Sequence, residues 1–376
     1  MLTRNVPATI VTPRRAIDVE ELFVGGQTSL RQGRPAEAAG AFDQIVRHDP
    51  DGPFAERALF QGALAHEASG DLEGAALRFE QVVYKLPEAP RSADALVRSM
   101  RIRLHLEQWE RAAEAGRLFL ERYPHATPGA RIIAYASRAL GLLAAERISE
   151  AEYFIAKGME IVDALELDRA GRIPRDLAHL YFALGEARRL RGEAVRLSGK
   201  VQEFAAQLEQ RCQLLLSAQA AYSDVMRAYD AHWSTIAGFR VGQLYERLHT
   251  ELMTVPLPRA GTLREQQLFE GAMRLRYSVL LNKASSMLDH TLAMARRTGE
   301  GSEWVTRTER ARRDLTEAMV QEQQALDKLP FSRVDLQRAL DDLAARSTVQ
   351  PASTSAAPAP RGEAAHRPGT GGGTDP

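Results

Sequence analysis

The hydrophobic and polar positions of residues 16–165 follow a repeat. Turn residues, an aromatic residue and a closing proline return with a period of about 37 residues. Glycine at the turn accepts a positive φ, an aromatic ring can wedge between units, and proline ends the second helix of a unit. The pattern therefore predicts stacked helical hairpins. The positions in register are Gly33, Phe42 and Pro50, then Gly70, Phe79 and Pro87, then Ala112 and Pro124.

Helical periodicity continues beyond these repeats, and the predicted helices become longer. Leu177 begins a helix that we expect to end near Gly192 or Gly199. From Val201 to Tyr229, apolar residues recur at steps of three and four. This spacing predicts one continuous helix roughly 45 Å long.

Four further helices complete the predicted fold. Residues 233–252 keep helical spacing until Pro256 forbids its continuation. Residues 263–297 and 303–327 are predicted to form an antiparallel pair, because the glycine-containing turn between them separates two helical patterns. Residues 331–345 are predicted to form a short helix.

The repeat resembles the tetratricopeptide repeat. A third unit is a weaker match, with Glu107 in the turn and Gly116 at the usual aromatic position, and a fourth hairpin is expected across residues 130–163. The matching residues are Leu22, Gly26, Ala38, Phe42 and Pro50, then Leu59, Ala63, Ala75, Phe79 and Pro87, then Leu96, Met100, Ala112, Phe119 and Pro124.

The resemblance and the helical pattern together imply an all-α fold, a right-handed α-solenoid of tetratricopeptide-like helical hairpins followed by long C-terminal helices. Residues 346–376 are rich in Pro, Gly and Ala and are expected to be disordered. The predicted divisions are an irregular segment at 1–15, the repeat array at 16–165, a long-helix extension of the solenoid at 175–260, a helical hairpin with a short helix at 262–345, and the tail at 346–376.

Composition narrows the classes of partner. The chain of 376 residues carries 49 Lys and Arg against 49 Asp and Glu. Its net field therefore attracts neither nucleic acid nor an anionic membrane, and we expect no nucleic-acid partner. We find no apolar stretch long enough to cross a bilayer. The one cysteine, Cys212, lies on the apolar seam of a predicted helix, where we expect it to be inert.

The sequence offers no recognisable catalytic, cofactor-binding or metal-binding constellation. The histidines are scattered without the spacing of a metal site, and the Gly299–Gly301 turn has no strand before it and no lysine after it. We therefore expect no cofactor, no metal and no enzyme activity, although an enzyme with an unrecognised site stays a third possibility. Two arginine clusters, at 188–200 and 307–313, alternate with acids and are interpreted as solvated helix faces in preference to surfaces for an anionic partner.

The tetratricopeptide resemblance implies a concave groove that holds a partner protein. Phe23, Phe60 and Leu64 would suit an amphipathic helix or an extended apolar segment, unless the C-terminal helices fold back and cover them. The implied groove residues are Phe23, Gln27, Arg31, Arg57, Phe60, Leu64, Glu67, Asp94, Arg101 and His105.

A second resemblance concerns the C-terminal half. Residues 237–246, 256–258 and 301–304 are similar to segments of bacterial, myxobacterial-type tetratricopeptide proteins, some connected with the gliding-motility machinery of the cell envelope. Such proteins usually carry an export signal or a lipidation cysteine, and residues 1–15 show neither.

These observations predict a non-enzymatic protein–protein interaction scaffold, an accessory subunit of a bacterial envelope or motility assembly. The alternative is a cytoplasmic regulatory subunit that binds and controls a soluble enzyme. As the sequence is written we expect a cytoplasmic protein, or a periplasmic or envelope-associated one if the true start lies upstream.

Overall fold

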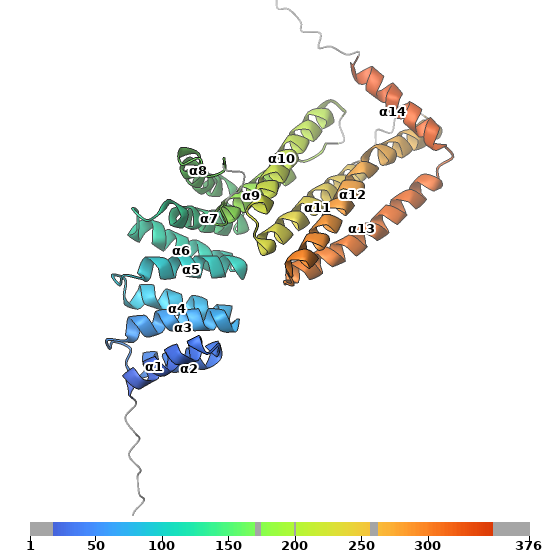
Figure 1. Cartoon of the computed structure of the whole chain (residues 1–376). Helices are drawn as coiled ribbons and strands as arrows, with labels where there is room; N and C mark the ends of the chain where they lie inside the picture. Colours follow the sequence, from blue (N-terminus) through green and yellow to red (C-terminus); the bar gives the residue numbers. More distant parts are fainter. Residues whose placement is uncertain (1–17, 170–173, 199–200, 256–261, 349–376) are drawn as a thin grey trace, which may run out of the picture.

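The computed structural model describes residues 18–169, 174–198, 201–255 and 262–348. Within these ranges the chain forms fourteen α-helices and no strand (Figure 1). The protein is an all-α solenoid, as the sequence predicts. The predicted irregular segment at 1–15, and residues 349–376 of the predicted tail, lie outside the described residues.

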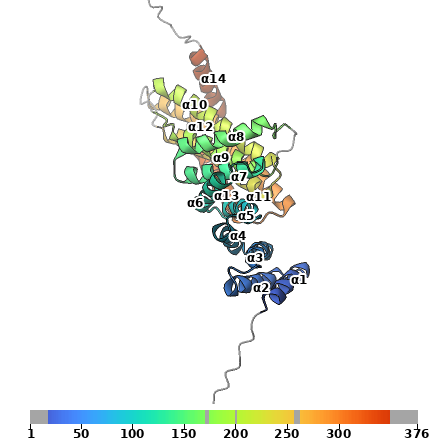
Figure 2. The same ribbon diagram turned by 90° about the vertical axis from the view of Figure 1, so that its left-hand side faces the viewer.

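The first eight helices form four hairpins stacked in a column (Figures 1 and 2). The second helix of each hairpin packs on the first helix of the next, so α2 contacts α3, α4 contacts α5 and α6 contacts α7. The predicted hairpins are confirmed, the fourth included. Their bounds are α1 (Val19–Arg31) with α2 (Pro35–His48), α3 (Ala55–Ser69) with α4 (Leu72–Lys85), α5 (Ser92–His105) with α6 (Trp109–Arg122), and α7 (Pro128–Ala144) with α8 (Ile148–Ala164).

Aromatic rings fill the spaces between and within hairpins. Phe42 and Phe79 are fully buried. Phe42 lies so close to Gly26 of its own hairpin and Gly62 of the next that a Cβ at either glycine would be 3.0 or 3.2 Å from its side chain. Phe79 meets Phe60 edge-on with ring centroids 5.5 Å apart. Phe79 also belongs to one buried cluster with Leu96 and Met100 of the third hairpin, so both rings lie between hairpins as predicted.

The turns inside the hairpins use a left-handed residue. Gly33 and Gly70 have φ of 71° and 85°, and Glu107 and Glu146 take the same conformation in the third and fourth hairpins with φ of 57° and 58°. The turn geometry thus persists where the sequence departs from glycine, at a cost in backbone strain of about 1 kcal/mol for each glutamate.

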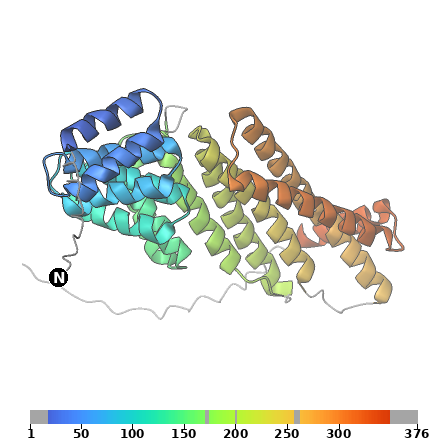
Figure 3. The ribbon, with the colours of Figure 1, turned by 90° about the horizontal axis from the view of Figure 1, so that it is seen from below.

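Six further helices, most of them longer, continue the solenoid and form an arm that leaves the column at an angle (Figures 1 and 3). The hairpin order persists, since α9 packs on α7 and α8 and pairs with α10, and α11 pairs with α12. Their bounds are α9 (Leu177–Ala194), α10 (Val201–Arg227), α11 (Ala231–Thr254), α12 (Leu263–Thr298), α13 (Glu303–Asp327) and α14 (Arg333–Thr348).

The predicted helix ends are correct to within a few residues, with one correction. The final helix runs from Arg333 to Thr348, so it begins and ends later than predicted and includes the first residues assigned to the tail. Ser332 caps its start, because its hydroxyl accepts a hydrogen bond from the Asp335 amide.

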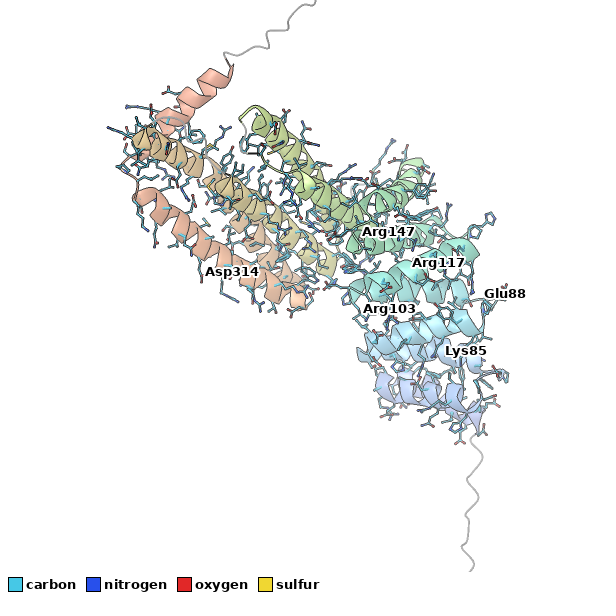
Figure 4. All side chains as sticks on the ribbon, turned by 180° about the vertical axis from the view of Figure 1, so that it is seen from behind. Lys85, Glu88, Arg103, Arg117, Arg147 and Asp314 are labelled. Atoms are coloured by element: carbon cyan, nitrogen blue, oxygen red, sulfur yellow. The ribbon has the colours of Figure 1, made fainter. Side chains whose placement is uncertain are left out.

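A buried arginine joins the second and third hairpins. The Arg103 side chain of α5 is fully buried, and its guanidinium donates to both oxygens of Glu80 at 2.8 and 2.9 Å and to Glu73 at 2.8 Å. The hydrogen bonds from Arg103 and Gln108 hold the pKa of Glu73 at about 2. Figure 4 shows Arg103 within the stack, whereas Glu88 lies at its outer edge.

We expect Phe79→Ala to lower the free energy of unfolding by about 3–5 kcal/mol, because the substitution leaves a cavity between the second and third hairpins. Urea unfolding measures the change. Tyr84→Ala is the matched control, since Tyr84 is exposed on the same helix. Equal effects of the two substitutions would mean that Phe79 is not a wedge.

Arg103→Met should lower the free energy of unfolding by about 3 kcal/mol, because it leaves the largely buried Glu80 carboxylate without its partner. Adding Glu80→Met removes that uncompensated charge, so the double variant should be more stable than the single one. A double variant less stable than Arg103→Met would contradict this account.

Candidate functional site

The column and the arm border an open cavity of about 630 Å³ at their inner corner. The last turns of α3 and α5 bound it on one side, and the first turns of α9 and α11 on the other. The turn between α12 and α13 contributes Glu300. Figure 1 shows these helix ends converging at the inner corner.

Three predicted groove residues meet in this corner cavity. Glu67, Arg101 and His105 line it, and Arg101 and Asp94 line an adjoining cavity of about 410 Å³ between α5 and α7. Both cavities are lined by Arg101 and by Asp176 of the arm, whose side chains form an ion pair of 2.8 Å. We call the two cavities together the corner cleft.

The predicted apolar groove surface is not free. Phe23 packs edge-on against Phe42 and is covered by the Arg57 guanidinium, 4.5 Å above its ring. Phe60 packs against Phe79 and lies under Arg91 at 5.0 Å. This corrects the interpretation of the two rings as groove-facing: burying a phenylalanine gains about 1.5–3 kcal/mol, so both rings turn into the hairpin interior.

The remaining predicted groove residues lie on the first helices of the first and second hairpins. Gln27 and Leu64 are half-buried, and Leu64 packs against the core of the second and third hairpins. Arg31 is exposed and donates to Thr28 of its own helix at 3.3 Å. The structure does not bring these three residues into the corner cleft.

The arm meets the predicted groove at the third hairpin. Besides the Arg101–Asp176 pair, the rings of His105 and His232 lie with centroids 4.0 Å apart, and Arg307 of α13 pairs with Glu107 at 3.4 Å. The C-terminal helices therefore reach α5 and the turn after it, and they form the far wall of the cleft there.

The cleft carries more acidic than basic side chains. Asp176 and Asp230 are the N-caps of α9 and α11, where a negative charge is favourable next to the helix dipole. Arg101 pairs with Asp176, and Arg175 lies 3.5 Å from Asp230. Glu67 and Glu300 add two further carboxylates to the corner cavity, so its neutral-pH charge is negative.

Two histidines of the arm are held neutral. Burial lowers the pKa of His179 to about 4, and its ring packs against Trp233 at 4.7 Å. Burial and the neighbouring His105 also lower the pKa of His232. Among the described atoms, both ring nitrogens of His232 are buried without a hydrogen-bond partner.

Sequence reasoning missed the residues that the arm contributes. Asp176 and His179, and likewise Asp230 and His232, stand at the first turns of two long helices. An aspartate cap followed within three residues by histidine, found twice, is the signal that could have marked them. Only the packing of the arm brings these turns to α5.

No catalytic or metal constellation is evident in the described part of the chain. No group of three His, Cys, Asp or Glu side chains there is placed to hold a metal ion. Cys212 is partly buried, and burial raises the pKa of its thiol, which lowers its reactivity. None of the described helices combines the length and apolarity needed to cross a bilayer.

Part of the first arginine cluster is interior, which corrects its interpretation as a solvated face. Arg189 is largely buried and pairs with Glu186 at 2.7 Å and Glu193 at 3.0 Å. Glu186 also accepts a hydrogen bond from Tyr222 of α10 and pairs with Arg240 of α11. The cluster thus holds α9, α10 and α11 together.

A larger cavity of about 1100 Å³ lies outside this site. It opens between the first turn of α6 and the last turn of α7 and is lined by Trp109, Arg138 and Arg147 among others. Residues from two adjacent helices dominate it, whereas five helices and a turn converge on the corner cavity. We therefore take the corner cleft as the candidate site.

Comparisons with known proteins give similarities only to solved structures. No family model matches the chain, and no curated protein matches it. A tetratricopeptide repeat protein from Parabacteroides merdae is 14% identical, with a TM-score of 0.39 over 79% of this chain and 98% of that one. A MamA RS-1 double mutant is 21% identical, with a TM-score of 0.33 over 53% and 95% of the two chains. The tetratricopeptide domain of P58(IPK) is 15% identical, with a TM-score of 0.25 over 89% and 100%.

We expect the protein to lose stability as the pH falls from about 6.5 to 4. An unfolded histidine has a pKa near 6.5 and His179 about 4 in the fold, so in this window the unfolded chain binds the extra proton. Full protonation costs about 3 kcal/mol for this one buried group. Urea unfolding at stepped pH measures the loss.

His179→Gln should reduce that acid sensitivity, because glutamine does not titrate. His125→Gln is the control, since His125 is exposed on the column. An unchanged pH profile in His179→Gln would show that His179 does not cause the loss.

Proposed function

We propose that the protein is a non-enzymatic scaffold that holds a segment of a partner protein in the corner cleft. The observation that carries the proposal is the convergence of exposed Arg101, His105 and Glu67 of the column on the first turns of α9 and α11. Polar side chains from many helices, gathered in one hollow, suit the side chains and backbone of a peptide segment.

The cleft is better suited to an irregular or extended segment than to an apolar helix. The two cavities of about 630 and 410 Å³ each have room for a few side chains. The corner cavity contains charged side chains on several sides, while the rings of Phe23 and Phe60 that would anchor an amphipathic helix are buried. We therefore expect recognition by charge and hydrogen bonding.

The setting we propose for the scaffold is a bacterial envelope or gliding-motility assembly, with control of a soluble enzyme as the alternative. The sequence resemblance of residues 237–246 supports the envelope or gliding-motility assembly. Packing also accounts for part of this segment, because a Cβ on Gly238 or Gly242 of α11 would lie 2.1 Å from Thr291 or 2.6 Å from Leu288 of α12. These glycines serve the arm and say nothing of the partner.

A cross-linked pull-down with the full chain, run separately on soluble and envelope fractions, tests both parts of the proposal. We expect Arg101→Glu to lower recovery of the partner at least tenfold, because it breaks the Arg101–Asp176 pair and reverses a charge in the middle of the cleft. Lys85→Glu, an exposed charge reversal on α4, is the matched control and should recover the partner as the wild type does.

Each outcome of that pull-down has a definite meaning. Equal recovery by wild type and Arg101→Glu would show that the cleft is not the binding site. A partner found in the envelope fraction supports the envelope assembly, whereas recovery with one soluble enzyme supports the alternative.

A further inference from the structure

One wall of the corner cavity contains a buried base with no hydrogen-bond partner. His232 is 9% exposed, lines the cavity, and has neither ring nitrogen bonded to any described atom. A neutral imidazole has one nitrogen that donates and one that accepts. Leaving a buried hydrogen-bonding group without a partner costs about 1–3 kcal/mol, so a ligand that bonds to His232 would be favoured.

A largely buried carboxylate stands beside that histidine. The side chain of Glu300 is 14% exposed, and the Ser302 amide donates to it at 3.0 Å. Burial raises the pKa of Glu300, but the Ser302 hydrogen bonds and His232 outweigh it and keep the pKa below the usual value. In the described part of the chain, its one ion-pair contact is His232 Nδ1, at 3.7 Å.

The two groups do not satisfy each other at neutral pH. An ion pair between them requires a protonated His232, and both burial and the neighbouring, tilted His105 ring oppose that proton. The distance of 3.7 Å is also too long for a direct hydrogen bond. Glu300 is thus an anion without a full counter-charge, next to an unused acceptor nitrogen.

The surrounding charges favour a cation over an anion. Arg101 and Arg175 are engaged with Asp176 and Asp230, and Arg98 lies 3.6 Å from Glu67. Among the described residues, Glu300 is thus the cavity carboxylate without an arginine partner, and an incoming anion would meet its charge. An ammonium or guanidinium group, which has donors and no acceptor, would satisfy Glu300 and the acceptor nitrogen of His232 together.

We propose that the corner cavity binds a cationic side chain of the partner segment, a lysine or an arginine, between Glu300 and His232. The proposal rests on the scaffold function above and specifies its ligand class. Trp233, the neighbour of His232 on α11, is almost fully buried and adds an apolar edge to this wall.

Butylammonium chloride, an analogue of the lysine side chain, is the probe for this proposal. The full-length chain carries ¹³C-labelled histidine, and the His232 imidazole signal, assigned with His232→Gln, is followed during the titration. We expect a saturable shift with a millimolar midpoint. Sodium chloride at equal ionic strength and sodium butyrate, an anion of the same length, should cause none.

Glu300→Gln should weaken butylammonium binding at least tenfold, because it removes the charge and keeps the acceptor for Ser302. Glu88→Gln, a neutralisation of an exposed carboxylate at the outer edge of the stack and away from the cavity, is the control and should change the midpoint less than twofold. Thermal melting of both variants verifies that the fold is intact. The proposal is overturned if butylammonium causes no shift, if Glu300→Gln responds as the wild type does, or if butyrate causes the shift and butylammonium does not.

The two proposals fail separately. If Arg101→Glu loses the partner in the pull-down but butylammonium does not bind, the scaffold stands and the cationic ligand class is wrong. If butylammonium binds but partner recovery does not depend on Arg101, the cavity accepts cations and the scaffold site is wrong.

Discussion

Each helical hairpin of this protein has apolar residues on both of its faces. It can bury these residues only against the hairpins before and after it. The fully buried Phe42 and Phe79 show this constraint, because each ring fills space that two helices must share. Stability in such a stack is a sum over neighbours, so every hairpin depends on the next. The arm follows the same rule with longer helices, and the column and arm form one continuous solenoid.

The corner cleft is a consequence of that continuity. Because α9 packs on both α7 and α8 and the following helices are longer, the first turns of α9 and α11 come to lie opposite α5. Helix starts carry carboxylate caps and unpaired amides, so polar chemistry gathers where several of them converge. The site is therefore made of helix ends, and the helix faces supply the core.

Buried polar groups in this protein fall into two kinds. Arg103 with Glu80, and Glu186 with Arg189 and Tyr222, form networks in which each charge has a partner, and they fix how adjacent helices align. His232 and Glu300 are different, because neither satisfies the other at neutral pH. Satisfied networks serve the fold, whereas the unsatisfied pair is where we propose that a cationic ligand binds.

The sequence by itself determined the helices, the hairpin period and the residues that stack, because periodicity at three and four residues and turn-forming glycines are local signals. It also named Arg101 and His105, which the structure places in the lining of the corner cavity. It did not show that Phe23 and Phe60 turn inward, since a helix position alone does not say which neighbour a ring meets. Only the tertiary structure decided that His232 lies against His105: residues so far apart in the chain meet through the stacking angle of every intervening hairpin, and no local pattern encodes that angle.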